Sequence, residues 1–313
     1  MTVLVTGASG YVGAALIPRL RAQGLAVRAF ARDPARVAAT GVDVAGLEIV
    51  TGDAVGGAGL DAALDGVEVA YFLIHSMETA AGAAGDGFRS RDRRAAEAFA
   101  LACRRAGVRR VVYLGGPVPA AGVVSPHLAS RLEVEQTLLE AAPEALALRA
   151  SIIVASRSRS FRFLVRLVER VPVMPLPAWR DHRTRPLDGR DMLAFLLAGG
   201  TSPAVDGPLS LDIAGPDVVT FGELVARIQD ALLVGRMPVR LPFNLTPVAS
   251  RVAAAISGED HALIGPLMES LESDLLPRDD RAAELLGVRR HHLDAAIERA
   301  LREWESIEEL RAR

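Results

Sequence analysis

The chain contains no lysine, and all 36 of its basic residues are arginines. This absence indicates a compositional bias, so an arginine where lysine is usual carries little information by itself. The 38 acidic residues bring the formal net charge to −2, which excludes the basic excess expected of a nucleic-acid-binding protein. The single cysteine, Cys103, excludes an intramolecular disulfide framework and a cysteine-cluster metal site. We therefore predict no nucleic-acid partner and no metal.

The sequence also lacks an apolar run that could cross a bilayer. The longest strand-like run, residues 67–74, falls far short of the roughly 20 residues that a membrane helix needs. Met1 leads directly into the apolar run V-L-V, without the charged segment of a secretory signal. We expect a cytoplasmic protein with no membrane partner. Half of the 313 residues are hydrophobic, enough for one large core or for a core with a smaller lobe.

Strand-like and helix-like segments alternate through the first half of the chain. The apolar runs are continuous, which is typical of parallel strands covered by helices on both faces. Residues 88–106 place Ala95, Phe99 and Cys103 on one helical face, so we interpret Cys103 as a small core residue. The alternation predicts an α/β fold with a doubly wound parallel sheet, a Rossmann fold. The predicted strands are residues 2–6, 26–31, 47–51, 67–74, 110–114 and 145–150.

The pattern loosens after residue 150, where a proline-rich segment occupies residues 171–177. The motif T-F-G-E at 220–223 has the spacing of a capping box and predicts a helix over 224–233. We divide the chain into a Rossmann domain, residues 1–150, and a smaller C-terminal α+β lobe, residues 151–313. The lobe is expected to interleave with the first domain and to lie over the carboxyl edge of the sheet.

The motif T-G-A-S-G-Y-V-G follows the first predicted strand and precedes a helix-like segment. Gly7 permits a tight turn, Gly10 lets the backbone approach a pyrophosphate, and Gly13 allows close packing of helix on strand. The amides at the helix start would face the phosphates. The segment predicts a dinucleotide site, and the contacts expected between the glycines are Ser9, Tyr11 and Val12.

Three strand ends carry further candidates for this site. The second strand ends at Arg32, placed to meet a 2′-phosphate, although Asp33 could serve the ribose of NAD or pair with the arginine. This favours NADP(H) over NAD. Asp53 after the third strand could accept a hydrogen bond from the adenine amino group, or cap its own loop. His75 after the fourth strand is a catalytic candidate, or a structural loop histidine.

With these residues the chain resembles the short-chain dehydrogenase/reductase superfamily. It is similar to the atypical NmrA-like branch and to the NAD(P)H-binding accessory subunit of respiratory complex I. The motifs that carry the resemblance are T-G-A-S-G-Y-V-G, A-R-D-P, T-G-D-A, Y-F-L-I-H-S-M, A-G-V-R-R-V-V-Y-L-G-G, S-P-H-L-A-S-R-L-E-V-E, R-P-L-D-G-R-D-M and A-G-P-D-V-V-T-F-G-E-L. The resemblance implies that Leu73, Ile74 and Gly115 flank the ribose and nicotinamide.

The catalytic positions depart from the family pattern. Members usually carry a serine after the fifth strand and then Y-x-x-x-K, whereas this chain has Gly115-Gly116 and then His127-Leu128-Ala129-Ser130-Arg131. Arg131 could anchor the ribose with its fixed donors, but it cannot relay protons. His127 could act as a general acid, or could simply lie at a helix entry that Ser125 caps and Pro126 begins.

Two basic features lie outside these motifs. Arg183 and Arg185 precede Asp191 and could grip an anionic substrate, or could form a solvated basic loop. The pair His291-His292 has no carboxylate at ligand spacing, so we assign no metal to it.

Three functions remain open at this point. The first is an NADP(H)-dependent oxidoreductase acting on a small organic carbonyl, alcohol or enone-like substrate, with His127, Arg131 and His75 as catalytic candidates. The second is an NAD(P)H-binding sensor or scaffold without turnover, and the third is a redox-neutral isomerase or cyclase. Fold analogy alone does not choose among them. We expect a small-molecule partner, and a homodimer is compatible with this reading.

Overall fold

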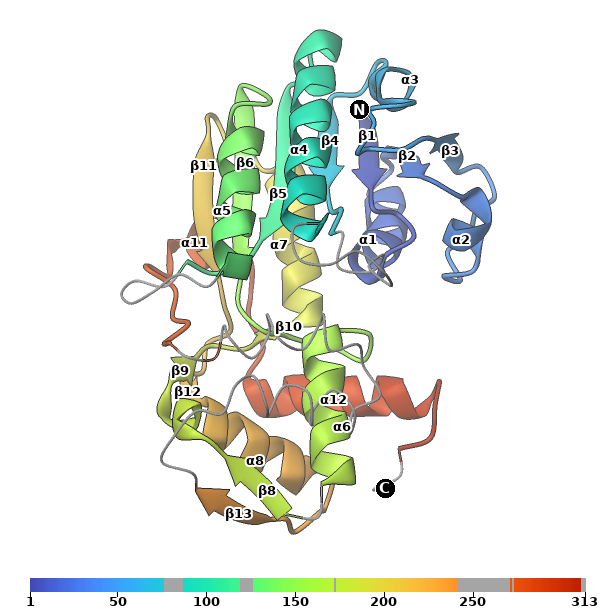
Figure 1. The fold of residues 1–313 in the computed structure, drawn as a ribbon. Helices are drawn as coiled ribbons and strands as arrows, with labels where there is room; N and C mark the ends of the chain where they lie inside the picture. Colours follow the sequence, from blue (N-terminus) through green and yellow to red (C-terminus); the bar gives the residue numbers. More distant parts are fainter. Residues whose placement is uncertain (76–86, 119–125, 172, 241–270, 272, 311–313) are drawn as a thin grey trace.

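Seven parallel strands form the central sheet of the molecule, in the order β11-β6-β5-β4-β1-β2-β3 (Figure 1). The computed structural model describes residues 1–75, 87–118, 126–171, 173–240, 271 and 273–310. The predicted doubly wound parallel sheet is confirmed. The strands are β1 Thr2–Thr6, β2 Ala26–Ala31, β3 Glu48–Thr51, β4 Val69–Phe72, β5 Arg110–Gly115, β6 Glu144–Ala150 and β11 Leu209–Ile213.

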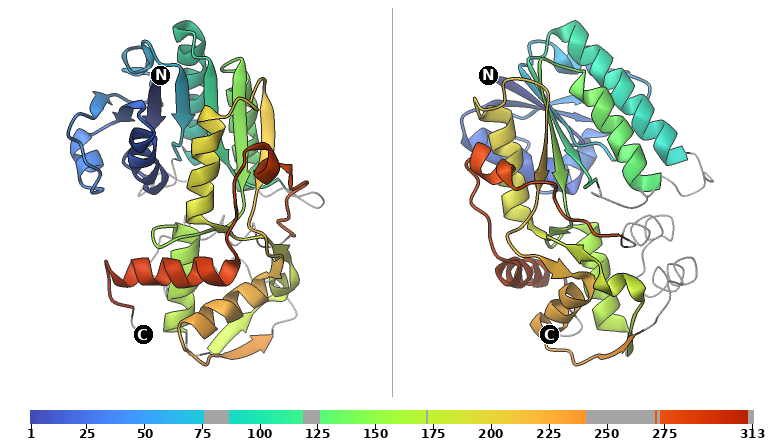
Figure 2. Two further views of the ribbon diagram at one scale, coloured as in Figure 1. Left: turned by 180° about the vertical axis from the view of Figure 1, so that it is seen from behind. Right: turned by 90° about the vertical axis from the view of Figure 1, so that its left-hand side faces the viewer.

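Helices cover both faces of this sheet, as the continuous apolar strands require. One face carries α4 (Gly87–Ala106) and α5 (Pro126–Leu139), and the other carries α1 (Tyr11–Ala22) and α7 (Gly189–Thr201) (Figure 2). The predicted helix 88–106 is confirmed as α4. Cys103 is buried in the core beneath it, and burial raises the pKa of its thiol. The interpretation of Cys103 as a core residue is therefore confirmed.

The second half of the chain contributes to both parts of the molecule. Strand β11 and helix α7 join the sheet, whereas β7 (Ile153–Val154), α6 (Arg159–Arg170), α8 (Phe221–Ala231) and α12 (Leu293–Glu305) lie with the lobe below the carboxyl ends of the strands (Figure 1). Strand β11 was not predicted, because L-S-L-D-I is short and only its last three residues are buried. The predicted capping box is confirmed at Thr220 and Glu223, and it starts α8 three residues earlier than expected.

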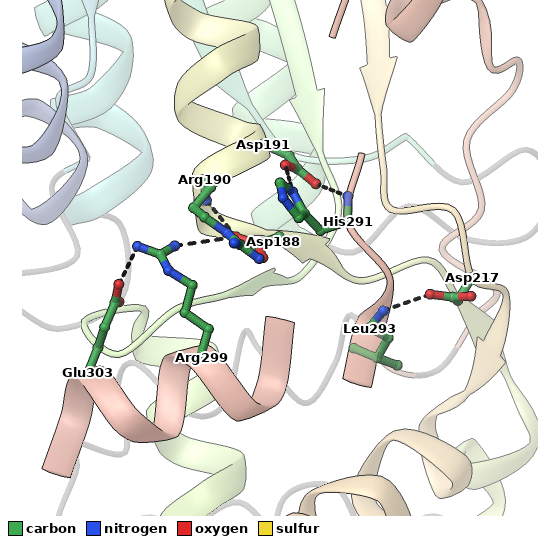
Figure 3. Close-up of polar contacts among 8 residues, drawn as sticks. All are labelled: Asp188, Arg190, Asp191, Asp217, His291, Leu293, Arg299 and Glu303. Carbon is green, nitrogen blue, oxygen red and sulfur yellow. Dashed lines mark hydrogen bonds and ion pairs between the residues drawn. The ribbon is translucent and has the colours of Figure 1, made fainter. Parts of the chain in front are cut away.

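Several arginines and histidines of the lobe are paired with distant aspartates. Arg183 holds Asp274 through two hydrogen bonds of 3.0 and 2.8 Å, and Arg185 pairs with Asp280 at 3.2 Å. The suggestion that they grip a substrate is replaced by this structural role. His291 contacts Asp191 through its ring and its backbone amide, at 2.6 and 2.7 Å (Figure 3). Sequence spacing could not show this carboxylate, because it lies 100 residues away.

None of the helices in the described ranges combines the length and the apolar run that a membrane span needs.

The strand order of the sheet reverses at β1. Strands β2 and β3 lie on one side of β1, whereas β4, β5 and β6 lie on the other side. Strand β4 ends at Phe72, shorter than predicted, so the chain turns away from β1 there. Thr6, at the end of β1, is fully buried and connects the end of β1 to the end of β4. Its hydroxyl donates to the Tyr71 carbonyl at 2.9 Å and accepts from the Leu73 amide at 3.2 Å. Ligands of doubly wound folds bind at such a switch point.

We expect Thr6→Val to destabilise the protein by about 2–3 kcal/mol, because it keeps the shape but leaves the Tyr71 carbonyl and the Leu73 amide without this partner. Thr6→Ser is the matched control, since it retains the hydroxyl and loses only a methyl group, a cost of about 1 kcal/mol. Urea unfolding of the three proteins measures both free energies. A Thr6→Val variant no less stable than Thr6→Ser would show that the hydroxyl does not hold the strand ends.

Candidate active site

The glycine-rich segment runs directly from β1 into α1, as predicted. Gly7 has φ of +65°, and a Cβ there would lie 2.6 Å from the Leu73 carbonyl oxygen. A Cβ on Gly13 would lie 2.4 Å from the Gly7 carbonyl oxygen. Both distances are too short for any side chain, so only glycine lets the loop, β4 and α1 approach so closely. The resulting cradle has the backbone geometry that a pyrophosphate requires.

A cleft of about 370 Å³ opens beside this loop, at the carboxyl ends of β1 to β4. Ten of the predicted cofactor contacts line it, and Gly115 and Arg131 do not. The residues brought together are Gly7, Ser9, Gly10, Tyr11, Val12, Gly13, Arg32, Asp53, Leu73 and Ile74.

Four arginines also line the cleft: Arg32, Arg91, Arg157 and Arg159. Sequence reasoning missed the last three, because Arg91 lies on α4 and the other two come from the lobe, with no motif to mark them. They give the cleft the positive charge that suits a phosphorylated ligand.

The two aspartates considered for this site are engaged in local turns. Asp33 caps α2 (Pro34–Ala38) by accepting from the Ala35 amide at 2.9 Å, and it is not part of the cleft wall. Asp53 lines the cleft but accepts from the amides of Val55 and Gly56 at 3.4 and 3.3 Å. The end of β2 thus presents Arg32 to the cleft, and Asp53 caps its own loop while still facing the cleft.

A second cavity of about 320 Å³ adjoins the cleft. Its wall is mainly aliphatic, with residues from β5, α5, β7 and α6 that include Leu114, Leu128, Ile153 and Leu164. Its polar groups are few, and they come from three serines, His75 and Arg131. The residues that line both cavities are Val12, Leu73, His75, Ile153 and Ser158. A ligand in the second cavity would therefore meet the end of a ligand in the cleft.

His75 and Arg131 meet at this junction. The ring Nδ1 of His75 lies 3.3 Å from Arg131 Nη1 and also 3.3 Å from Asp92 Oδ2. One nitrogen cannot accept from arginine and donate to a carboxylate at the same time, so the two contacts belong to different tautomers. Arg131 also donates to the Leu114 carbonyl, and its guanidinium lies 5.0 Å from the centre of the Tyr113 ring.

The helix that carries the predicted H-x-x-x-R pair is α5, and it begins at Pro126 as expected. Arg131 points from this helix into the second cavity. The side chain of His127 and the proposed cap Ser125 lie outside the described residues, so the role of His127 stays a prediction.

Comparison with known proteins identifies the first half of the chain. Residues 7–148 match the family model for NAD(P)H-binding domains. This segment is similar to NAD(P)H-binding domains, as the predicted resemblance to the short-chain dehydrogenase/reductase superfamily implies. The predicted resemblance to atypical members of that superfamily is confirmed, whereas the NmrA-like branch stays a prediction.

Relatives of the NAD(P)H-binding chain include two bacterial proteins and one solved structure. It is 29% identical to a ceramide reductase of Caulobacter vibrioides over 77% of this chain and 73% of the relative. It is 40% identical to sterol demethylase protein B of Methylococcus capsulatus, but over only 36% of this chain and 34% of that protein. A short-chain dehydrogenase/reductase superfamily protein from Agrobacterium tumefaciens with bound NAD has the same fold, with a TM-score of 0.69, 19% identity and coverage of 98% and 96%.

Two effects lower the pKa of His75 in this NAD(P)H-binding protein. The larger is desolvation of the ring, although 37% of the side chain remains exposed, and the second is the positive charge of Arg131. Asp92 opposes both. Because the folded pKa lies below the ordinary value of about 6.5, the ring is neutral at pH 7 and gains its proton only in more acidic solution. A neutral ring can accept a proton but is a poor donor.

We expect Arg131→Gln to raise the pKa of His75 toward its ordinary value, because the substitution removes a cation 3.3 Å from the ring nitrogen. Titration of the imidazole carbon-bound protons by NMR measures the shift. Arg89→Gln, on the exposed surface of α4, is the control and should leave the titration unchanged. An unaltered His75 pKa in Arg131→Gln would contradict the assigned coupling.

Proposed function

We propose that this protein is an NADP(H)-dependent oxidoreductase acting on a carbonyl or alcohol group that is carried by an aliphatic substrate. The observation that carries the proposal is the aliphatic cavity that shares five residues with the cofactor cleft. A sensor without turnover has no need of a second apolar cavity at the end of its cofactor site. A pocket with an apolar wall and a few convergent polar groups is typical of enzymes that act on small molecules.

The residue at the end of β2 supports NADP(H) as the cofactor. Arg32 lines the cleft and has no carboxylate partner among the described residues, while Asp33 is used as a helix cap. A guanidinium binds a 2′-phosphate through charge-assisted hydrogen bonds, and a carboxylate in that position would repel it. Arg91, Arg157 and Arg159 add positive charge in the same cleft.

The aliphatic wall supports an apolar substrate, and so does the relative named a ceramide reductase. Ceramide carries long alkyl chains, which would be buried favourably against leucine and isoleucine side chains at about 25 cal/mol per Å². The proposed substrate class is therefore a carbonyl compound with an alkyl chain, reduced to the alcohol.

The nicotinamide cofactor would supply or accept the hydride. On this proposal the guanidinium of Arg131 stabilises the negative charge that develops on the carbonyl oxygen, because it is permanently charged and lines the substrate cavity. The proton in the reductive direction comes from His127 or from water, since His75 is neutral at pH 7. In the reverse direction neutral His75 is suited to accept a proton.

We expect tighter binding of NADPH than of NADH, and a loss of about 10- to 100-fold in NADPH affinity on Arg32→Ala, because charge-assisted hydrogen bonds are worth about 1.5–3 kcal/mol. NADH affinity should change little. Fluorescence titration of each reduced cofactor measures the four constants. Arg36→Ala, in α2 and outside the cleft wall, is the control. Equal affinities for the two cofactors, or a preference that survives Arg32→Ala, would refute the choice of NADP(H).

We expect NADPH oxidation with a series of straight-chain aldehydes and 2-alkanones, with kcat/KM rising about fourfold per added methylene until the cavity is filled. Each buried methylene contributes about 0.8 kcal/mol. Leu164→Gln should flatten this dependence, because Leu164 lines the aliphatic cavity. Leu233→Gln, at an 85% exposed position far from the cavity, should not. Tight NADPH binding without turnover of any substrate would refute the oxidoreductase and support the sensor.

A further inference from the structure

A third cavity, of about 600 Å³, lies between the sheet domain and the lobe and is lined by residues of α1 and α12. Neither the cofactor nor the proposed substrate accounts for it. On the sheet-domain side its wall includes one face of α1, because the lining residues of this helix are spaced three and four apart. These residues are Tyr11, Ala14, Ala15, Pro18 and Arg19. Residues 40–43, after α2, also line the cavity.

On the lobe side the wall includes one face of α12, formed by Ala296, Arg299, Ala300 and Glu303, together with residues 154–157. Each helix contributes two alanines to the wall, and their short side chains leave open space between the helices. Gly189 at the start of α7 closes the floor. A Cβ there would lie 2.8 Å from the Tyr11 hydroxyl oxygen, so a residue larger than glycine would crowd the Tyr11 side chain.

One end of the cavity carries charges that are already balanced. Asp188 is buried, and both of its oxygens accept from Arg190, at 3.1 and 3.0 Å from Nε (Figure 3). Arg299 pairs with Glu303 and reaches Asp188 at 3.8 Å. These four side chains form a closed network, which has no charge left for a ligand.

Two other arginines of the wall, Arg19 and Arg157, lack such balance. Arg19 donates to the Ala15 carbonyl at 2.7 Å, and Arg157 donates to the Thr40 carbonyl at 3.4 Å. Neither guanidinium pairs with a carboxylate among the residues that the structure describes. Asp43 also lines the cavity, but it lies 4.0 Å from Arg21, which is outside the wall. The unbalanced charge of the wall is therefore positive.

We propose that this cavity is a binding site for a small organic anion, with its phosphate or carboxylate group at Arg19 and Arg157 and its apolar part between the alanine faces of α1 and α12. Tyr11 adds a neutral hydroxyl donor, since burial raises the pKa of Tyr11 to about 12. Guanidinium groups bind both kinds of anion through paired N–H donors. The proposal goes beyond the proposed function, because it requires neither turnover nor a choice between NADP(H) and NAD(H).

Tyr11 and Arg157 line both this cavity and the cofactor cleft. An anion could therefore bind in the phosphate-binding part of the cleft instead, and the test must separate the two places. The protein is first saturated with whichever nicotinamide nucleotide it binds more tightly. Hexyl phosphate and hexanoate are then titrated into it by isothermal calorimetry.

We expect at least one of the two probes to bind the saturated protein, and Arg19→Gln to weaken that binding about tenfold or more, as loss of a charge-assisted hydrogen bond implies. Arg36→Gln is the control for a lost surface charge. Ala15→Leu, which fills the cavity without removing charge, should also abolish binding and serves if Arg19→Gln does not fold. Cofactor affinity should be unchanged in both variants, since neither residue lines the cleft.

Binding of hexyl phosphate alone identifies the natural group as a phosphate, and binding of hexanoate alone identifies it as a carboxylate. The proposal is overturned if neither probe binds the wild-type protein, or if saturation with the nucleotide abolishes binding. It is also overturned if Arg36→Gln weakens binding as much as Arg19→Gln.

Discussion

The divergence of the chain after the paired strands β1 and β4 is the constraint on which the rest of the structure depends. Strand β1 pairs with β2 on one side and with β4 on the other. After β1 the chain enters the glycine loop, and after β4 it turns away from that loop. The hydroxyl of Thr6 satisfies the backbone that the separation leaves open, and Gly7 allows the Leu73 carbonyl to pass close to the loop. Both the cofactor cleft and the aliphatic cavity open at this point, and Leu73 lines each of them.

The replacement of lysine by arginine has a chemical consequence at this junction. A lysine can lose its proton, whereas the Arg131 guanidinium stays charged and places that charge beside His75. The site therefore combines a fixed cation with a neutral imidazole. The fixed cation suits an oxygen that becomes negative, and the proton has to come from another group. The same compositional bias supplies the arginines of the cleft and of the third cavity.

Most of the sheet could be predicted because each strand is a local apolar run with a turn after it. The boundaries of β1 and β2 were correct, and β4 was predicted too long because Leu73 and Ile74 are apolar but line cavities instead of pairing with β1. Strand β11 escaped prediction because it is short and only its last three residues are buried. The arginines that the lobe contributes to the cleft escaped because their place depends on contacts between segments far apart in the chain.

The sequence by itself determined the parallel sheet, the glycine cradle and the arginine at the end of β2, because each depends on residues that are neighbours in the chain. Only the tertiary structure decided that His75 meets Arg131, and that Arg157 and Arg159 reach the cleft beside the glycine loop. These contacts join segments that are dozens of residues apart. Local patterns of polarity carry no information about them, because they depend on how α5 and the lobe pack against the sheet.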